Sequence, residues 1–185
     1  SPQNFNRLFV SLFGFFYVSW CLSFVLRLYF IEGIDFTGRY LALFLVAVPK
    51  IGDMGAYAAG VLPARRPGGN HKLAQAISPN KSWEGLIGSI AASIFVAVLL
   101  TWGGNGIIEV NDVPVIDYGV AVVFGFFAAI FGLLGDLAAS ALKRGAGAKD
   151  SGKLPGVGGA LDLADSLILV APVFYLYIGL VVFGA

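Results

Sequence analysis

Long runs of apolar residues, separated by short polar or glycine-rich segments, dominate the pattern along the chain. A helix needs about 20 apolar residues to cross the hydrocarbon core of a bilayer, and five runs are of about that length. The predicted spans cover residues 8–31, 40–62, 86–102, 118–142 and 161–183. The pattern therefore predicts an all-α, polytopic integral membrane protein with about five transmembrane helices.

The composition supports a membrane protein. Of the 185 residues, 58% are hydrophobic and 12% are charged, whereas a soluble domain usually carries about 25% charged residues. The only cysteine, Cys21, cannot form an internal disulfide. These numbers exclude an ordinary soluble enzyme, a disordered chain and a disulfide scaffold. A nucleic-acid partner is not expected either, because the net charge is only +1 and no known binding module is present.

The charges of the connecting segments predict the orientation. Residues 63–85 and 143–160 each contain four Lys or Arg residues. Residues 32–39 and 103–117 together contain one Arg against five acidic residues. Positively charged loops stay on the cytoplasmic side, so both basic segments and the N-terminus are expected inside.

Carboxylates within or beside the apolar runs indicate where the chemistry lies. Asp136 interrupts the fourth run, and an ionised side chain in a bilayer usually faces a cavity or a partner. Helical spacing puts three further residues on its face: Ser140, Lys143 and Arg144. Asp162 and Asp165 lie one turn apart where the next predicted helix begins. Three carboxylates are therefore expected to converge at the cytoplasmic rim.

Carboxylates mixed with basic residues suit a metal-bound polyphosphate. Mg²⁺ takes hard oxygen ligands, including phosphate oxygens, and Lys and Arg neutralise the remaining phosphate charge. The glycines of residues 145–159 would let backbone amides approach a phosphate. The alternative interpretation is that the acids pair with Lys143 and Arg144. Asp53 either lines the same polar cavity or pairs with Lys50, one turn earlier.

The basic segment before the third predicted helix contains local structural signals. Ser78-Pro79 predicts a turn, and Ser82 predicts the N-terminal cap of the helix that follows. His71 is the only histidine, which excludes a site built from several histidines.

Three blocks of residues resemble the phosphatidate cytidylyltransferase (CDP-diacylglycerol synthase) family. The longest, residues 140–165, follows the pattern S-x-x-K-R, then K-D, then L-P-G-x-G-G-x-x-D-x-x-D. The other two are Asp-Met-Gly-Ala-Tyr at 53–57 and His-Lys-Leu at 71–73, the latter followed by Ile-Ser-Pro-Asn-Lys-Ser-Trp-Glu-Gly at 77–85. The chain departs from the family pattern at Val157, where His is usual, and at Leu163, where Arg is usual.

The resemblance implies an enzyme that transfers CMP from CTP to phosphatidate, yielding CDP-diacylglycerol and pyrophosphate. It implies Mg²⁺, with a second cation left open, held by Asp136, Asp162 and Asp165. Lys143 and Arg144 would act with Asp165 in catalysis. The implied substrate-binding residues are Asp53, Ser78, Asn80, Lys81, Ser140 and Lys149. A homodimer in the bacterial plasma (inner) membrane is expected, with the active site on the cytoplasmic side.

Residues 1–185 are expected to form a single membrane-embedded catalytic domain, which is either a short family member or the C-terminal portion of a longer architecture. Three alternative functions remain open. The departures at Val157 and Leu163 leave room for a CTP transferase that acts on another lipid phosphate, or for a non-catalytic relative. The intramembrane acids Asp53 and Asp136 would also suit an ion-binding or transport protein.

Overall fold

Five long helices follow the five predicted spans. The computed structural model describes residues 2–31, 36–64, 70–74, 78–106, 108–110, 112–145 and 160–183. The helices are α1 (Pro2–Tyr29), α2 (Phe36–Ala64), α3 (Trp83–Gly103), α4 (Tyr118–Gly145) and α5 (Ala160–Phe183). The prediction of a helical, polytopic membrane protein is confirmed.

Four of these helices are long and apolar enough to cross a bilayer. The stretches concerned are Phe36–Val61, Trp83–Gly103, Tyr118–Ala141 and Asp165–Val182. In α1 the apolar stretch runs from Phe15 to Tyr29 and is shorter. A fifth crossing, made by α1, therefore stays a prediction.

Within the described ranges, two short antiparallel hairpins join the helices, and the sequence pattern did not predict them. One pairs β1 (Lys72–Ala74) with β2 (Ser78–Ser82), and the other pairs β3 (Ile108–Val110) with β4 (Val113–Ile116). The predicted turn at Ser78-Pro79 is wrong, because Ser78 already begins β2. Strand pairing satisfies backbone amides that a short connection between helices would otherwise leave without partners.

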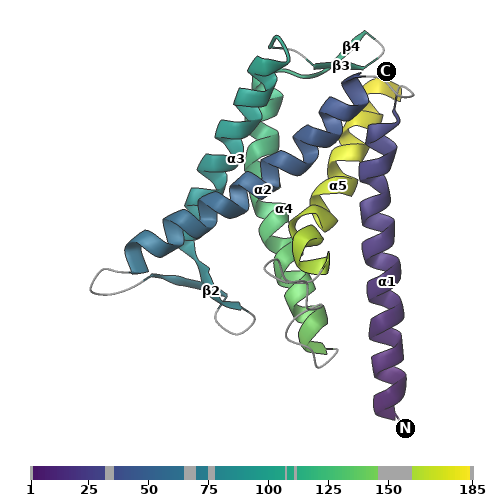
Figure 1. The fold of residues 1–185 in the computed structure, drawn as a ribbon, viewed down its shortest axis with the longest axis vertical. Helices are drawn as coiled ribbons and strands as arrows, with labels where there is room; N and C mark the ends of the chain where they lie inside the picture. The colour runs from purple at the N-terminus through teal and green to yellow at the C-terminus, as the bar shows by residue number, and fades with distance from the viewer. Residues whose placement is uncertain are drawn as a thin grey trace.

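The two ends of the bundle differ in what they carry. Figure 1 shows the β1–β2 hairpin, the C-terminal end of α4 and the N-terminal end of α1 toward one end, with the β3–β4 hairpin and the C-terminal end of α5 at the other. The helix ends that flank the two basic segments, 63–85 and 143–160, therefore lie toward the same end of the molecule. The predicted orientation requires this. Helix α2 crosses the bundle obliquely (Figure 1).

An aromatic cluster at the core joins three helices. Phe44 of α2, Phe124 of α4 and Phe174 of α5 form it, and Phe44 and Phe174 are fully buried. The ring centroids of Phe124 and Phe174 are 4.4 Å apart, and those of Phe44 and Phe174 are 5.9 Å apart. These separations are typical of favourable aromatic pairs, so the cluster holds α2, α4 and α5 together.

Glycines allow the helices to approach closely where they cross. A Cβ added to Gly55 of α2 would lie 2.6 Å from the carbonyl oxygen of Gly88 of α3, and a Cβ on Gly88 would lie 2.6 Å from that of Gly55. On α4, a Cβ at Gly125 would lie 2.7 Å from the Cα of Ile94. Small residues at such crossings let backbones pack directly on each other.

We predict that Gly88→Ala destabilises the protein while Gly179→Ala does not. Overpacking costs about 1–3 kcal/mol, which exceeds the roughly 0.5–1 kcal/mol that alanine gains over glycine within a helix. Gly179 lies on α5 with nothing within 4 Å of an added Cβ, so its variant isolates the helix-propensity effect. Thermal unfolding midpoints in one detergent are the measurement, and equal midpoints for the two variants would contradict the close crossing.

Candidate functional site

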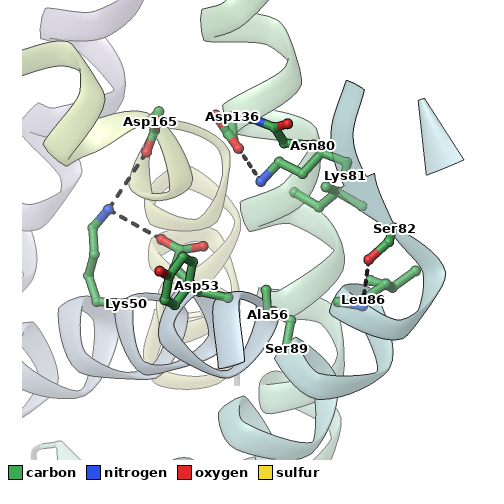
Figure 2. Close-up of a pocket in the computed structure, with 13 residues that line it drawn as sticks. Lys50, Asp53, Ala56, Asn80, Lys81, Ser82, Leu86, Ser89, Asp136 and Asp165 are labelled. Carbon is green, nitrogen blue, oxygen red and sulfur yellow. Dashed lines mark hydrogen bonds and ion pairs between the residues drawn. The ribbon is translucent and has the colours of Figure 1, made fainter. Parts of the chain in front are cut away.

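A pocket of about 300 Å³ with charged side chains in its wall opens among α2, α3, α4, α5 and strand β2. Its ionisable lining consists of three carboxylates, two lysines and one tyrosine: Asp53, Asp136, Asp165, Lys50, Lys81 and Tyr57. Figure 2 shows the carboxylates and the lysine ammonium groups directed toward one another from different elements. Asn80, Ser82 and Ser89 add uncharged polar groups to the wall.

Lys50 connects two of the carboxylates (Figure 2). Its Nζ lies 3.3 Å from Oδ2 of Asp53 on the same helix and 3.6 Å from Oδ1 of Asp165 on α5. The Asp165 side chain is only 13% exposed, and its Oδ1 also accepts a hydrogen bond of 2.7 Å from the backbone amide of Ser166. A carboxylate this buried needs such partners, because desolvation disfavours its charged form.

The third carboxylate has a lysine partner of its own. Lys81 of β2 forms an ion pair with Asp136 of α4. Strand and helix thereby contribute one charge each to the same wall of the pocket. Asn80 precedes Lys81 on the strand, and its amide group faces the same space (Figure 2).

A glycine contact explains why Asp136 and Asp165 reach one pocket. A Cβ added to Gly135 would clash with the backbone carbonyl of Asp165, so α4 and α5 touch through their backbones at this point. Asp136 is the next residue on α4, and it lines the same pocket as Asp165. A larger residue at 135 would separate the two helices and with them the two acids.

Hydrogen bonds at the start of α3 hold the hairpin that carries Lys81. The Ser82 hydroxyl accepts from the amide of Gly85 at 3.1 Å, which confirms the predicted helix cap. Oε1 of Glu84 lies 2.7 Å from Nδ1 of His71 and accepts from the His71 amide at 3.2 Å. The amide of Trp83 donates to the His71 carbonyl at 3.0 Å. These bonds tie both strands to the helix.

The structure brings five of the predicted site residues together: Asp53, Asn80, Lys81, Asp136 and Asp165. Ser78 is half-buried in β2, and Ser140 is half-buried on α4 one turn beyond Asp136. Neither lines the pocket. Arg144 is exposed at the end of α4.

The remaining predicted residues lie in parts that the structure does not describe in full. Lys143 and Asp162 are placed in α4 and α5, but their side chains are outside the described part. Lys149 and the glycine-rich residues 146–159 fall between the described ranges. Their predicted roles stay predictions.

Sequence reasoning gave Lys50 too small a role. Its pairing with Asp53 was one of two interpretations of that acid and is confirmed, but its contact with Asp165 was not predicted. In the described residues, Asp136 and Asp165 pair with Lys81 and Lys50, whereas the alternative interpretation gave them Lys143 and Arg144. The sequence signal for this larger role is that Lys50 is a cation within an apolar run. Like an acid in such a run, it needs a cavity or a partner of opposite charge.

The donor set suits Mg²⁺, although the described side chains alone do not form a complete metal site. Across the described ranges, no group of three His, Cys, Asp or Glu residues lies close enough to hold a metal ion. Asp136 and Asp165 nevertheless face one pocket. Mg²⁺ is usually bound through one or two carboxylates together with water and substrate phosphates, and two carboxylates at a pocket of this size meet that need.

These features define an integral membrane protein with a charged pocket set among its helices. A sequence model described as the cytidylyltransferase family matches residues 1–181. The chain belongs to that family, as the sequence resemblance indicated.

Curated relatives of the chain include named enzymes. The phosphatidate cytidylyltransferase of Thermotoga maritima is 38% identical over 161 residues, covering 86% of this chain and 55% of that protein. The phosphatidate cytidylyltransferase of Haemophilus influenzae is 36% identical over 142 residues, or 76% of this chain and 46% of that protein. The uncharacterized protein YnbB of Escherichia coli K12 is 39% identical over 146 residues, which cover 76% of this chain and 43% of that protein. The chain spans about half the length of these relatives.

We predict that Ser82→Ala lowers stability and that Ser82→Thr restores most of it. Loss of an N-cap side chain costs about 1 kcal/mol, and threonine retains the capping hydroxyl. The measurement is the thermal unfolding midpoint in detergent. If Ser82→Ala unfolded at the same temperature as the wild type, the cap would not hold the start of α3.

Proposed function

We propose that this chain is the membrane-embedded catalytic part of a cytidylyltransferase that makes CDP-diacylglycerol and pyrophosphate from CTP and phosphatidate. The observation that carries the proposal is that carboxylates of α2, α4 and α5 line the same pocket as the lysines of α2 and β2. The names of the Thermotoga and Haemophilus relatives support the choice of substrates.

The net negative charge of the pocket supports the proposal that a cation binds there. Three carboxylates face two ammonium groups, so the formal charge of the lining is −1 when all five groups are ionised. CTP and phosphatidate are both anionic, and they would be repelled unless further positive charge were present. Asp136 and Asp165, with Asp162, would hold Mg²⁺ there. When bound, Mg²⁺ supplies charge neutralisation and a template for phosphate oxygens.

The reaction requires little covalent chemistry from the protein. A phosphate oxygen of phosphatidate attacks the α-phosphorus of CTP, a new P–O bond forms, and the bond to the bridging α–β oxygen breaks. The electron pair of that bond leaves on pyrophosphate. The nucleophile is already an anion and needs no general base. The residues therefore act by positioning and by stabilising charge, with Lys81, Lys143, Arg144 and Lys149 as the phosphate partners.

The pocket also borders the surface where a lipid would arrive. Tyr57 lines the pocket and is 76% exposed, and Met54 on the same helix is 69% exposed. In a helix long and apolar enough to span a bilayer, such side chains would meet lipid. A phosphatidate headgroup would enter beside α2 while its acyl chains stay in the bilayer. The distribution of basic residues favours a cytoplasmic pocket in the bacterial plasma membrane, and the homodimer stays a prediction.

A second candidate is cytidylyl transfer to a different lipid phosphate. The observation that favours it is the pair of sequence departures at Val157 and Leu163, beside the acids expected to bind the metal. Competition among lipid phosphates for CMP transfer would distinguish the two candidates, because a phosphatidate enzyme prefers phosphatidate. The ion-transport alternative gains no support from the described residues, because Asp53 and Asp136 line one pocket.

We predict that purified protein converts labelled CTP and phosphatidate to labelled CDP-lipid with Mg²⁺, and that Asp165→Asn abolishes turnover. The amide removes a negative charge from the pocket and weakens metal binding, yet it remains able to accept the hydrogen bond from Ser166. Circular dichroism and size-exclusion elution establish that the variant is folded. If folded wild type made no CDP-lipid across several detergents and metals, the proposed function would be wrong.

A matched pair of lysine variants tests the wall formed by β2. Lys81→Met should lower kcat/KM for CTP at least roughly tenfold, the effect of losing one charged hydrogen bond of about 1.5–3 kcal/mol. Lys72→Met should leave it unchanged, because Lys72 is exposed on the partner strand and does not line the pocket. If Lys81→Met kept the wild-type kcat/KM, as Lys72→Met is expected to do, Lys81 would not contact the substrate.

A further inference from the structure

Lys50 occupies a position where a lysine is costly. It lies fourteen residues after the start and eleven before the end of the apolar stretch Phe36–Val61. A charged side chain in such a helix is tolerated when it faces a cavity or pairs with an opposite charge. Lys50 does both, because it lines the pocket and contacts two carboxylates. Its presence is therefore explained by the pocket rather than by the packing of α2.

The geometry leaves N–H donors of Lys50 available to a ligand. A lysine ammonium group has three N–H donors and no acceptor. In the described part of the chain, it donates a hydrogen bond to Asp53 at 3.3 Å and forms an ion pair with Asp165 at 3.6 Å, a separation too long for a hydrogen bond. These acids hold the amine from two helices, and the side chain stays 31% exposed. The N–H groups that do not donate to Asp53 are thus available to water or to an anionic oxygen within the pocket.

The sequence carries a second observation. Leu163 stands between the two acids of the D-x-x-D motif, so the motif itself contains no cation. A positive charge beside Asp165 must therefore come from another segment. The structure shows a positive charge arriving at Asp165 from α2. A lysine on a neighbouring helix thus supplies the positive charge that the motif itself lacks.

We propose that Lys50 is a phosphate-binding residue of the active site, held between Asp53 and Asp165, and that it supplies the positive charge that the D-x-x-D motif does not contain. This inference rests on the proposed cytidylyl transfer. Its chemical target is a phosphate oxygen of CTP, because an ammonium group placed beside two carboxylates presents a point charge and free N–H donors.

Steady-state kinetics with CTP and phosphatidate test the proposal. Lys50→Met should raise KM for CTP roughly 10- to 100-fold, the effect expected for a lost charged hydrogen bond. Lys50→Arg, which keeps the charge, should lose less than tenfold. Adding Leu163→Arg to Lys50→Met should recover at least tenfold, because it places a cation in the motif. Lys72→Met is the control and should leave KM unchanged.

A double variant distinguishes a loss of CTP binding from misfolding. Lys50→Met leaves Asp53 and Asp165 without their shared partner, whereas Lys50→Met with Asp53→Asn removes one charge of each sign and keeps the pocket at −1. The double variant should fold like the wild type and still show the raised KM. A residue that only braced α2 against α5 would lower the folded fraction and leave the KM of the folded molecules unchanged.

The outcomes separate the inference from the function on which it rests. Wild-type turnover together with an unchanged KM in folded Lys50→Met or in the double variant would overturn the role of Lys50 alone. Failure of Leu163→Arg to improve Lys50→Met would overturn the charge replacement. Absence of both turnover and CTP binding in the folded wild type would overturn the proposed function, and the role of Lys50 with it.

Discussion

The neutralisation of charges carried by apolar helices is the constraint on which this structure depends. Asp53 and Lys50 on α2, Asp136 on α4 and Asp165 on α5 would each be costly if they faced lipid. Each instead faces a shared pocket, and each has a partner of opposite charge. A buried charge that loses its partner is strongly destabilising. The helices that carry these groups must therefore pack together, and the pocket lies where they do.

Close backbone contacts set the dimensions of that pocket. Gly55 and Gly88 let α2 cross directly on α3, and Gly135 lets α4 touch the backbone of α5 at Asp165. The cluster of Phe44, Phe124 and Phe174 joins three of these helices elsewhere in the core. Charged side chains thus project from a rigid framework, which suits a reaction that depends on holding two phosphate groups in line.

The pocket's charge connects the fold to the proposed chemistry. With one carboxylate in excess, the lining would attract a divalent cation, and the charge of that cation would offset the charge of the anionic substrates of the proposed reaction. The lysines have complementary roles. Lys81 approaches from a polar strand that belongs to none of the candidate membrane spans, whereas Lys50 lies within an apolar helix. Lys50 gives Asp165 a positive charge that the D-x-x-D motif, with Leu163 between its acids, does not contain.

The sequence by itself determined the positions of the helices and identified most of the acids that need a polar environment. It could do so because apolar length and the cost of a buried charge are properties of a local stretch. It therefore predicted five helices, the cap at Ser82 and functional roles for Asp136 and Asp165. It could also propose Lys50–Asp53, which one helical turn brings together. Only the tertiary structure decided that Lys50 also reaches Asp165 and that Lys81 pairs with Asp136. These pairs join segments far apart in the chain, and helix packing selects them among several lysines of equal charge.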